Sequence, residues 1–163
     1  MQLIKAQVTN YRSAENSEEF SLDDVTCLVG KNEAGKSAVL MALAALNPHT
    51  ATKIVLNKER DYPRRFLTQY AARHPGENAI AVTTTWKLSN DDVKAVEAEC
   101  GEGILSSHEV KVWRRYESEG LEWKIPLDLV KACERQLDKF ALEDTERAPL
   151  KAAKTTDALR ELL

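Results

Sequence analysis

The sequence predicts a mixed α/β (α+β) fold in which antiparallel strands flank a strand–loop–helix unit. An apolar stretch at 25–29 runs directly into a glycine-containing loop, and an Ala- and Leu-rich stretch follows that loop. Two later regions, 79–88 and 110–125, alternate apolar with polar residues as half-buried strands do. The 163 residues, 43% of them hydrophobic, have the size of one domain and are enough to bury a core.

The charge balance and the cysteines exclude several classes of protein. The chain has 23 basic and 26 acidic side chains, a net charge of -3, so any contact with DNA would have to be local. Cys27, Cys100 and Cys133 are odd in number and far apart, which indicates neither a disulfide framework nor a zinc site. The longest apolar run, 38–46, is too short to cross a bilayer. We therefore expect a cytoplasmic protein with no membrane partner.

The N-terminal region predicts three strands. Residues 2–9 partly alternate polar with apolar side chains, as a half-buried strand does, and 10–13 predict a turn. Phe20 and Leu22 indicate a second, short strand. Residues 25–29 are apolar without alternation, so we expect a third strand, buried on both faces. Cys27 would then be a small buried hydrophobic side chain.

A helix is predicted directly after the glycine loop. Residues 37–46 are rich in Ala, Leu and Met around the whole circumference, which indicates a helix packed on several sides. Asn47-Pro48 should end it, because proline disfavours helical geometry in the residue before it. Residues 1–48 thus form the first part of the domain, and the polar stretch 49–78 is predicted to be an irregular basic loop.

The rest of the chain, 79–143, predicts antiparallel strands and helices. A strand at 79–88 is followed by Ser89 as the N-cap of a helix that ends near Glu99. Residues 110–116 and 121–125 predict a hairpin. A helix with one buried face should begin near Pro126, and residues 144–163 resemble the start of a helical insertion.

The loop between strand and helix has the spacing of a phosphate-binding loop. It reads Gly30, Lys31, Asn32, Glu33, Ala34, Gly35, Lys36, Ser37. The glycines allow a sharp turn and a close approach of the backbone to phosphates, and the N-terminus of the next helix adds amide donors. Lys36 would reach the β- and γ-phosphates of ATP and Ser37 would bind Mg²⁺. The alternative, a plain glycine turn with a solvated Lys36, explains the glycines but not the Lys36-Ser37 pair.

The front end, with Asn10-Tyr11-Arg12-Ser13 before the loop, resembles the ABC-type ATPase heads of the RecF, SMC and OLD nuclease families. The resemblance implies a P-loop NTPase whose Arg12 lies near the nucleotide, although a surface arginine in a turn is the alternative. It also implies a second head as partner, work in DNA repair or phage defence, and DNA contacts through other regions. No Asp-Glu-terminated apolar run, signature segment or nuclease carboxylate cluster follows the loop. We therefore expect a partial ATP-binding domain that hydrolyses ATP poorly by itself.

Two other functions remain open: a small P-loop kinase, and a noncatalytic module that uses bound nucleotide to order a partner surface. A basic cluster around Tyr62 could contact DNA or the nucleotide, although a solvated loop is the commoner explanation. The resemblance also suggests Gln69 as a γ-phosphate sensor. The histidines lie in predicted loops without a carboxylate or cysteine at ligand spacing, so they indicate no metal site. The basic cluster consists of Arg60, Arg64 and Arg65, and the histidines are His49, His74 and His108.

Overall fold

The computed structural model describes residues 1–31, 35–46, 55–118, 120–128, 130–131 and 148–149. The chain divides into two compact units, which are described separately. The sheet unit comprises Gln2–Lys87 and Val110–Lys124. The second unit comprises Met1, Leu88–Glu109 and Ile125–Leu163.

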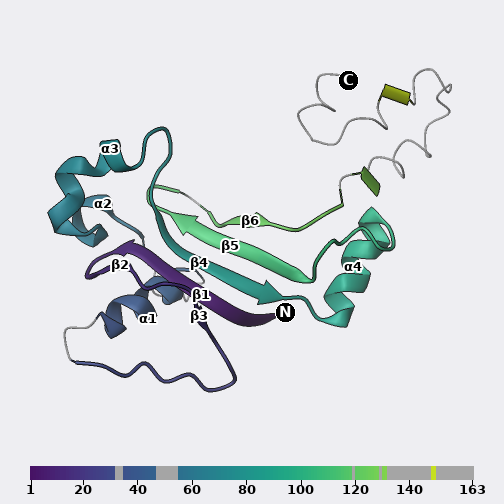
Figure 1. Ribbon diagram of the computed structural model, residues 1–163, viewed down its shortest axis with the longest axis horizontal. Helices are drawn as coiled ribbons and strands as arrows, with labels where there is room; N and C mark the ends of the chain where they lie inside the picture. Colours follow the sequence, from purple (N-terminus) through teal and green to yellow (C-terminus); the bar gives the residue numbers. More distant parts are fainter. Residues whose placement is uncertain (32–34, 47–54, 119, 129, 132–147, 150–163) are drawn as a thin grey trace. The chain divides into compact units, whose positions relative to one another are not determined.

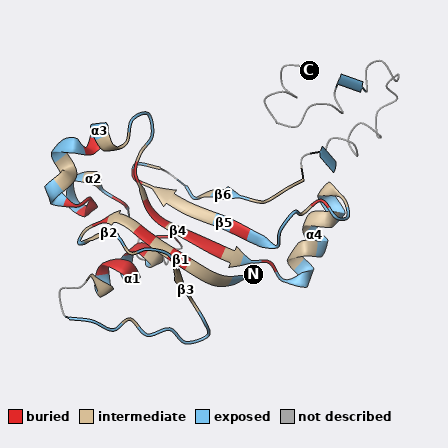
Figure 2. Ribbon diagram, viewed as in Figure 1, coloured by how far each residue is buried: buried red, intermediate tan, exposed pale blue. Residues whose placement is uncertain are grey.

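The sheet unit is built on two long antiparallel strands, β1 (Gln2–Tyr11) and β4 (Ile80–Lys87) (Figure 1). Their register pairs Val8 with Val82, and both side chains are fully buried. Figure 2 shows that buried residues gather on these two strands. The predicted strands at 2–9 and 79–88 are confirmed, and so is a mixed α/β fold with an antiparallel sheet.

Four shorter strands complete the sheet. Its order is β2-β1-β4-β5-β6, and β3 also pairs with β1. The predicted hairpin is confirmed by β5 (Glu109–Arg115) and β6 (Glu122–Lys124), which are antiparallel. β3 (Phe20–Ser21) confirms the short strand predicted there. β2 (Ala14–Asn16) was not predicted: β1 runs on to Tyr11, and the chain reverses in the two residues that follow it.

Residues 25–29 do not form the buried strand that the sequence predicts. Val25 is 86% exposed and Val29 is 92% exposed, and Cys27 is exposed as well. Only Leu28 packs against the core. A strand needs hydrogen-bonded neighbours, and no strand in the described part of the chain pairs with this stretch. Without a pairing partner, this apolar stretch forms no strand and remains largely exposed.

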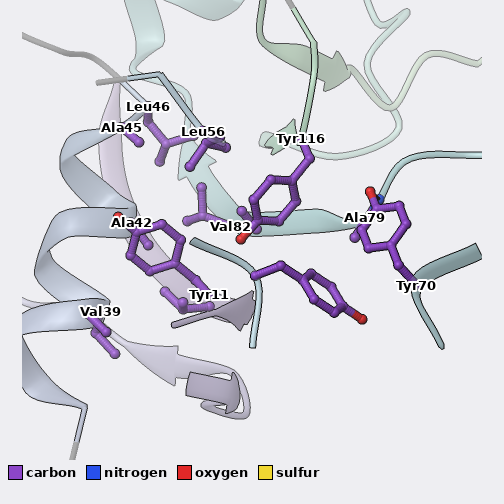
Figure 3. Packing of buried hydrophobic residues seen from close by; sticks show 14 residues of the cluster. Tyr11, Val39, Ala42, Ala45, Leu46, Leu56, Tyr70, Ala79, Val82 and Tyr116 are labelled. Atoms are coloured by element: carbon purple, nitrogen blue, oxygen red, sulfur yellow. Dashed lines mark hydrogen bonds between the residues drawn. The ribbon is translucent and has the colours of Figure 1, made fainter. Parts of the chain in front are cut away.

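Helix α1 (Lys36–Ala44) confirms the helix predicted after the loop. It contacts β1 and β4, and its buried residues are Ala38, Val39 and Ala42. Figure 3 shows Val39 and Ala42 on this helix. Leu40 and Met41 are 59% and 40% exposed, so the prediction of packing on several sides is wrong. The helix packs on the sheet through its buried residues, and Leu40 and Met41 lie on the side of the helix that faces away from the sheet. The stop predicted at Asn47-Pro48 lies outside the described residues.

The stretch 55–78 is not the irregular loop that the sequence predicts. It forms α2 (Lys58–Asp61), a 3₁₀ helix η1 (Arg64–Gln69) and α3 (Tyr70–Arg73). Tyr62 lies in the same buried cluster as Tyr70 and Tyr116, and its ring meets both of theirs edge to face. Figure 3 shows Tyr70 and Tyr116 in this cluster. The burial of aromatic rings, which a count of polar residues overlooks, orders this segment.

In the second unit, helix α4 (Asn90–Cys100) confirms the helix predicted after Ser89. The Ser89 side chain accepts a hydrogen bond from the Asp92 N–H, and the Asp92 carboxylate accepts one from the Ser89 N–H. Most of the helix predicted from Pro126 and almost all of 144–163 lie outside the described residues. No helix in the described ranges has the length and apolar character needed to cross a bilayer.

Candidate functional site

The structure describes both ends of the glycine loop, and Lys36 joins them. Its ammonium Nζ donates to the carbonyl oxygens of Gly30 at 2.6 Å and Lys31 at 2.7 Å. Asn32, Glu33 and Ala34 lie outside the described residues. The Lys36 ammonium group is thus held by carbonyl groups of the loop's own main chain. Because the ammonium group has three donors on a flexible side chain, it can exchange these carbonyls for the oxygen atoms of an anion.

The N-terminus of α1 is open to an acceptor from outside. Gly35 is its N-cap, with φ 84° and ψ 8°, a left-handed conformation that favours glycine. Within the described residues no side chain caps the helix, and its first turn has no acidic residue. The first amides of a helix lack partners within the helix and carry the positive end of its dipole. This end of α1 therefore suits an anion such as phosphate.

The turn after β1 lies against the loop. A Cβ atom built on Gly35 would come within 3.2 Å of the Ser13 hydroxyl oxygen. Such an approach is tighter than ordinary van der Waals contact, so only glycine fits here without a shift. The residue before Ser13 is Arg12, which therefore belongs to the turn that lies against the glycine loop.

Arg12 is fixed at both its backbone and its side chain. Its N–H donates to the Asp61 carbonyl at 2.6 Å, and its Nε and Nη2 each lie 3.1 Å from Asp61 Oδ1. The third nitrogen, Nη1, lies 3.2 Å from Sδ of Met41 on α1. The guanidinium group thus lies between α2 and the helix that follows the phosphate loop.

Asp61 carries its negative charge inside the protein, with a side chain that is 1% exposed. Burial by itself would raise the pKa of this carboxyl group. Hydrogen bonds from Arg60, from the backbone N–H of Asn57 and from Arg12 outweigh burial and hold the pKa below its ordinary value. Asp61 is therefore a carboxylate at neutral pH, paired with two arginines.

The other predicted site residues are dispersed. Lys31 and Ser37 are exposed at the loop. Arg65 pairs with Glu15, and Arg64 is exposed on η1, as is Gln69 at its end. The three arginines therefore do not form one patch aimed at the loop.

Two of the three histidines are described, and neither lies at the loop. His74 lies 3.0 Å from the hydroxyl of Tyr62, and burial and the nearby Arg73 lower its pKa. His108 is exposed and His49 lies outside the described residues. In the described residues no group of three or more His, Cys, Asp or Glu side chains could hold a metal ion. A magnesium ion would instead suit Ser37 together with phosphate oxygens, the usual way in which this ion is held.

Sequence reasoning missed Asp61 and Ser13. Asp61 lies 49 residues from Arg12, and nothing local in Arg60-Asp61-Tyr62 indicates a buried ion pair with a distant turn. Ser13 is recognisable only once the fold places it beside Gly35.

The glycine loop contains a lysine, and the helix after it starts at Gly35 with no capping side chain among the described residues. This combination is typical of proteins that bind phosphate groups. The family model described as AAA ATPase domain matches residues 1–102, which include the loop, the sheet's two long strands and α4. The chain belongs to this AAA ATPase domain family. No curated protein matches it. Family membership implies an ATP-binding ATPase, and the loop residues fit the phosphate end of that ligand.

Proposed function

We propose that residues 30–37, together with Arg12, bind ATP and Mg²⁺. The observation that carries the proposal is the pairing of Lys36 with the Gly30 and Lys31 carbonyls at the open N-terminus of α1. A positive charge and helix-start amides that no described side chain caps match the charge and the acceptors of a triphosphate.

Each residue has a separate role in this proposal. Lys36 leaves the loop carbonyls and turns its ammonium group toward the β- and γ-phosphates, where it offsets charge that develops in phosphoryl transfer. Gly35 allows the backbone its left-handed turn next to the phosphates. Ser37, exposed at the second position of α1, offers its hydroxyl to Mg²⁺. Arg12 adds a second positive charge from the neighbouring turn.

We further propose that the chain is part of an ABC-type head of the RecF, SMC and OLD kind, serving DNA repair or phage defence. Support comes from the order strand, Asn10-Tyr11-Arg12-Ser13, loop and helix, and from the AAA ATPase domain match. In this proposal a second head closes over the bound ATP. The side chains of Leu40 and Met41 on α1 are partly exposed, which is compatible with such a partner.

Calorimetry with ATP and Mg²⁺ tests the nucleotide site. Lys36→Ala should weaken binding by at least about a hundredfold, because charge-assisted contacts to phosphate are among the strongest polar interactions. The matched control is Lys94→Ala, which removes an exposed lysine of α4 and should leave the affinity unchanged. Unchanged affinity in Lys36→Ala would contradict the proposal and favour a plain glycine turn.

Light scattering with and without ATP tests the second head. ATP-dependent dimers that Lys36→Ala abolishes would support the ABC-type proposal. A chain that binds ATP but stays monomeric at every nucleotide concentration would contradict it and leave only the binding site. A phosphate-release assay completes the set, since brisk, Lys36-dependent hydrolysis by this chain alone would contradict the expectation of poor turnover.

A further inference from the structure

Asp61 joins the helical segment at 55–73 to the phosphate loop through one arginine. Its main-chain oxygen accepts from the Arg12 N–H at 2.6 Å, and its Oδ1 accepts from Arg12 Nε at 3.1 Å. Arg12 has φ 52°, which costs free energy in a residue with a side chain. The backbone contact to Asp61 holds this conformation, and the side-chain contacts then fix the direction of the guanidinium group.

Arg12 and Arg60 share the carboxylate of Asp61. Arg60 Nη2 lies 2.8 Å from Asp61 Oδ2, and its Nε lies 3.2 Å from each carboxylate oxygen. One carboxylate thus faces two guanidinium groups, with a net positive charge for the three side chains together. The Arg12 side chain is 37% exposed, while that of Asp61 is 1% exposed. The surplus charge is therefore accessible to a ligand and the carboxylate is not.

Arg12 belongs to the turn that contacts the start of α1, and its guanidinium group lies against the side of the same helix. Ser13, the next residue, lies against Gly35, and Arg12 Nη1 lies 3.2 Å from Met41 Sδ on α1. We infer that Asp61 is a positioning residue, which acts on the nucleotide only by holding the Arg12 guanidinium beside the phosphate loop. This inference rests on the proposed function. A purely structural Asp61 would tie α2 to the turn with no effect on nucleotide affinity.

A double-mutant cycle on ATP affinity separates these two roles. In the full chain, Asp61→Asn keeps the size of the side chain and removes its charge, and we expect ATP to bind about tenfold more weakly. Arg12→Ala should have a similar effect. Because Asp61 acts through Arg12, Asp61→Asn should change the affinity by less than about twofold once Arg12 is alanine. The measurement is calorimetry with ATP and Mg²⁺.

Lys94→Ala is the control, since it removes an exposed cation of α4 that does not contact Asp61. It should change the affinity by less than about twofold. Tighter or unchanged binding in Asp61→Asn would overturn the inference, and so would equal effects of Asp61→Asn in the wild-type and Arg12→Ala backgrounds. If the wild-type chain binds no ATP, both the proposed function and this inference are contradicted. The other outcomes test only the role of Asp61.

A second variant covers the case in which Asp61→Asn fails to fold. Arg12→Lys keeps the positive charge and leaves the buried carboxylate in place, but lysine cannot reproduce the paired Nε and Nη2 contacts. We expect it to lose about as much ATP affinity as Arg12→Ala. Wild-type affinity in Arg12→Lys would overturn the inference, because charge without positioning would then suffice.

Discussion

Helices α1 and α4 begin in opposite ways, although both follow a clear sequence signal. At α4, Ser89 and Asp92 satisfy each other's backbone amides, and Asp91 and Asp92 place negative charge in the first turn. At α1, the N-cap is the left-handed Gly35, with no acidic residue in the first turn and no capping side chain among the described residues. One helix thus supplies its own acceptors, whereas no described side chain supplies them at the other. This is the difference expected between a structural helix start and the phosphate-binding start that we propose for α1.

The largest effect should come from giving α1 the acidic residue that α4 has. Ser37→Glu places a carboxylate in the first turn, next to the amides that would bind phosphate. We expect ATP affinity to fall by about a hundredfold to a thousandfold, since like charges about 4 Å apart near a protein surface repel by about 4 kcal/mol. The free energy of unfolding should stay unchanged or rise by roughly a few tenths of a kcal/mol, because a carboxylate in the first turn interacts favourably with the helix dipole. Calorimetry and urea denaturation measure the two quantities.

Ser37→Ala is the control for that experiment. It removes the hydroxyl proposed for Mg²⁺ without adding charge, so its loss of affinity should be smaller and should depend on Mg²⁺. Equal affinity of Ser37→Glu and the wild-type chain would show that the start of α1 does not face the phosphates.

The two helix starts also show what the sequence can predict. The cap of α4 lies within four consecutive residues, Ser89 to Asp92, so its pattern is complete in the sequence. The loop from Gly30 to Ser37 is equally local. By contrast, the burial of 25–29 depends on a neighbouring strand, and the order of 55–78 depends on Tyr116, far along the chain. Composition alone therefore mispredicted both segments.

The Arg12–Asp61 pair shows the same limit within the candidate site. The resemblance to ABC-type heads singled out Arg12, but its partner lies 49 residues away in a segment predicted to be a loop. No local pattern encodes a contact at that separation. Asp61 can contact Arg12 only after folding has brought the turn after β1 and the end of α2 together.

The second prediction concerns the glycine conformation at the start of α1. Gly35 has φ 84° and Gly76 has φ 83°, but only Gly35 has a neighbour, Ser13, within 4 Å of an added Cβ. Gly76→Ala should lower the free energy of unfolding by about 1–2 kcal/mol through conformation alone. Gly35→Ala should cost about 2–3 kcal/mol because the contact adds to that strain. Urea denaturation gives both values, and equal costs would contradict the close approach of Ser13.

The smallest effect should come from removing the cap of α4. Ser89→Ala should lower the free energy of unfolding by about 1 kcal/mol at pH 7. Hydrogen bonds from Ser89 and from the N-terminus hold the pKa of Asp92 below its ordinary value. A lowered pKa stabilises the fold above the unfolded value of about 4, and this stabilisation is lost as the pH falls below it. The cost of Ser89→Ala should therefore shrink in acid, as thermal melts at pH 7 and at about pH 2 would show. ATP affinity should not change, because α4 binds no phosphate; a cost independent of pH would mean that Asp92 does not depend on Ser89.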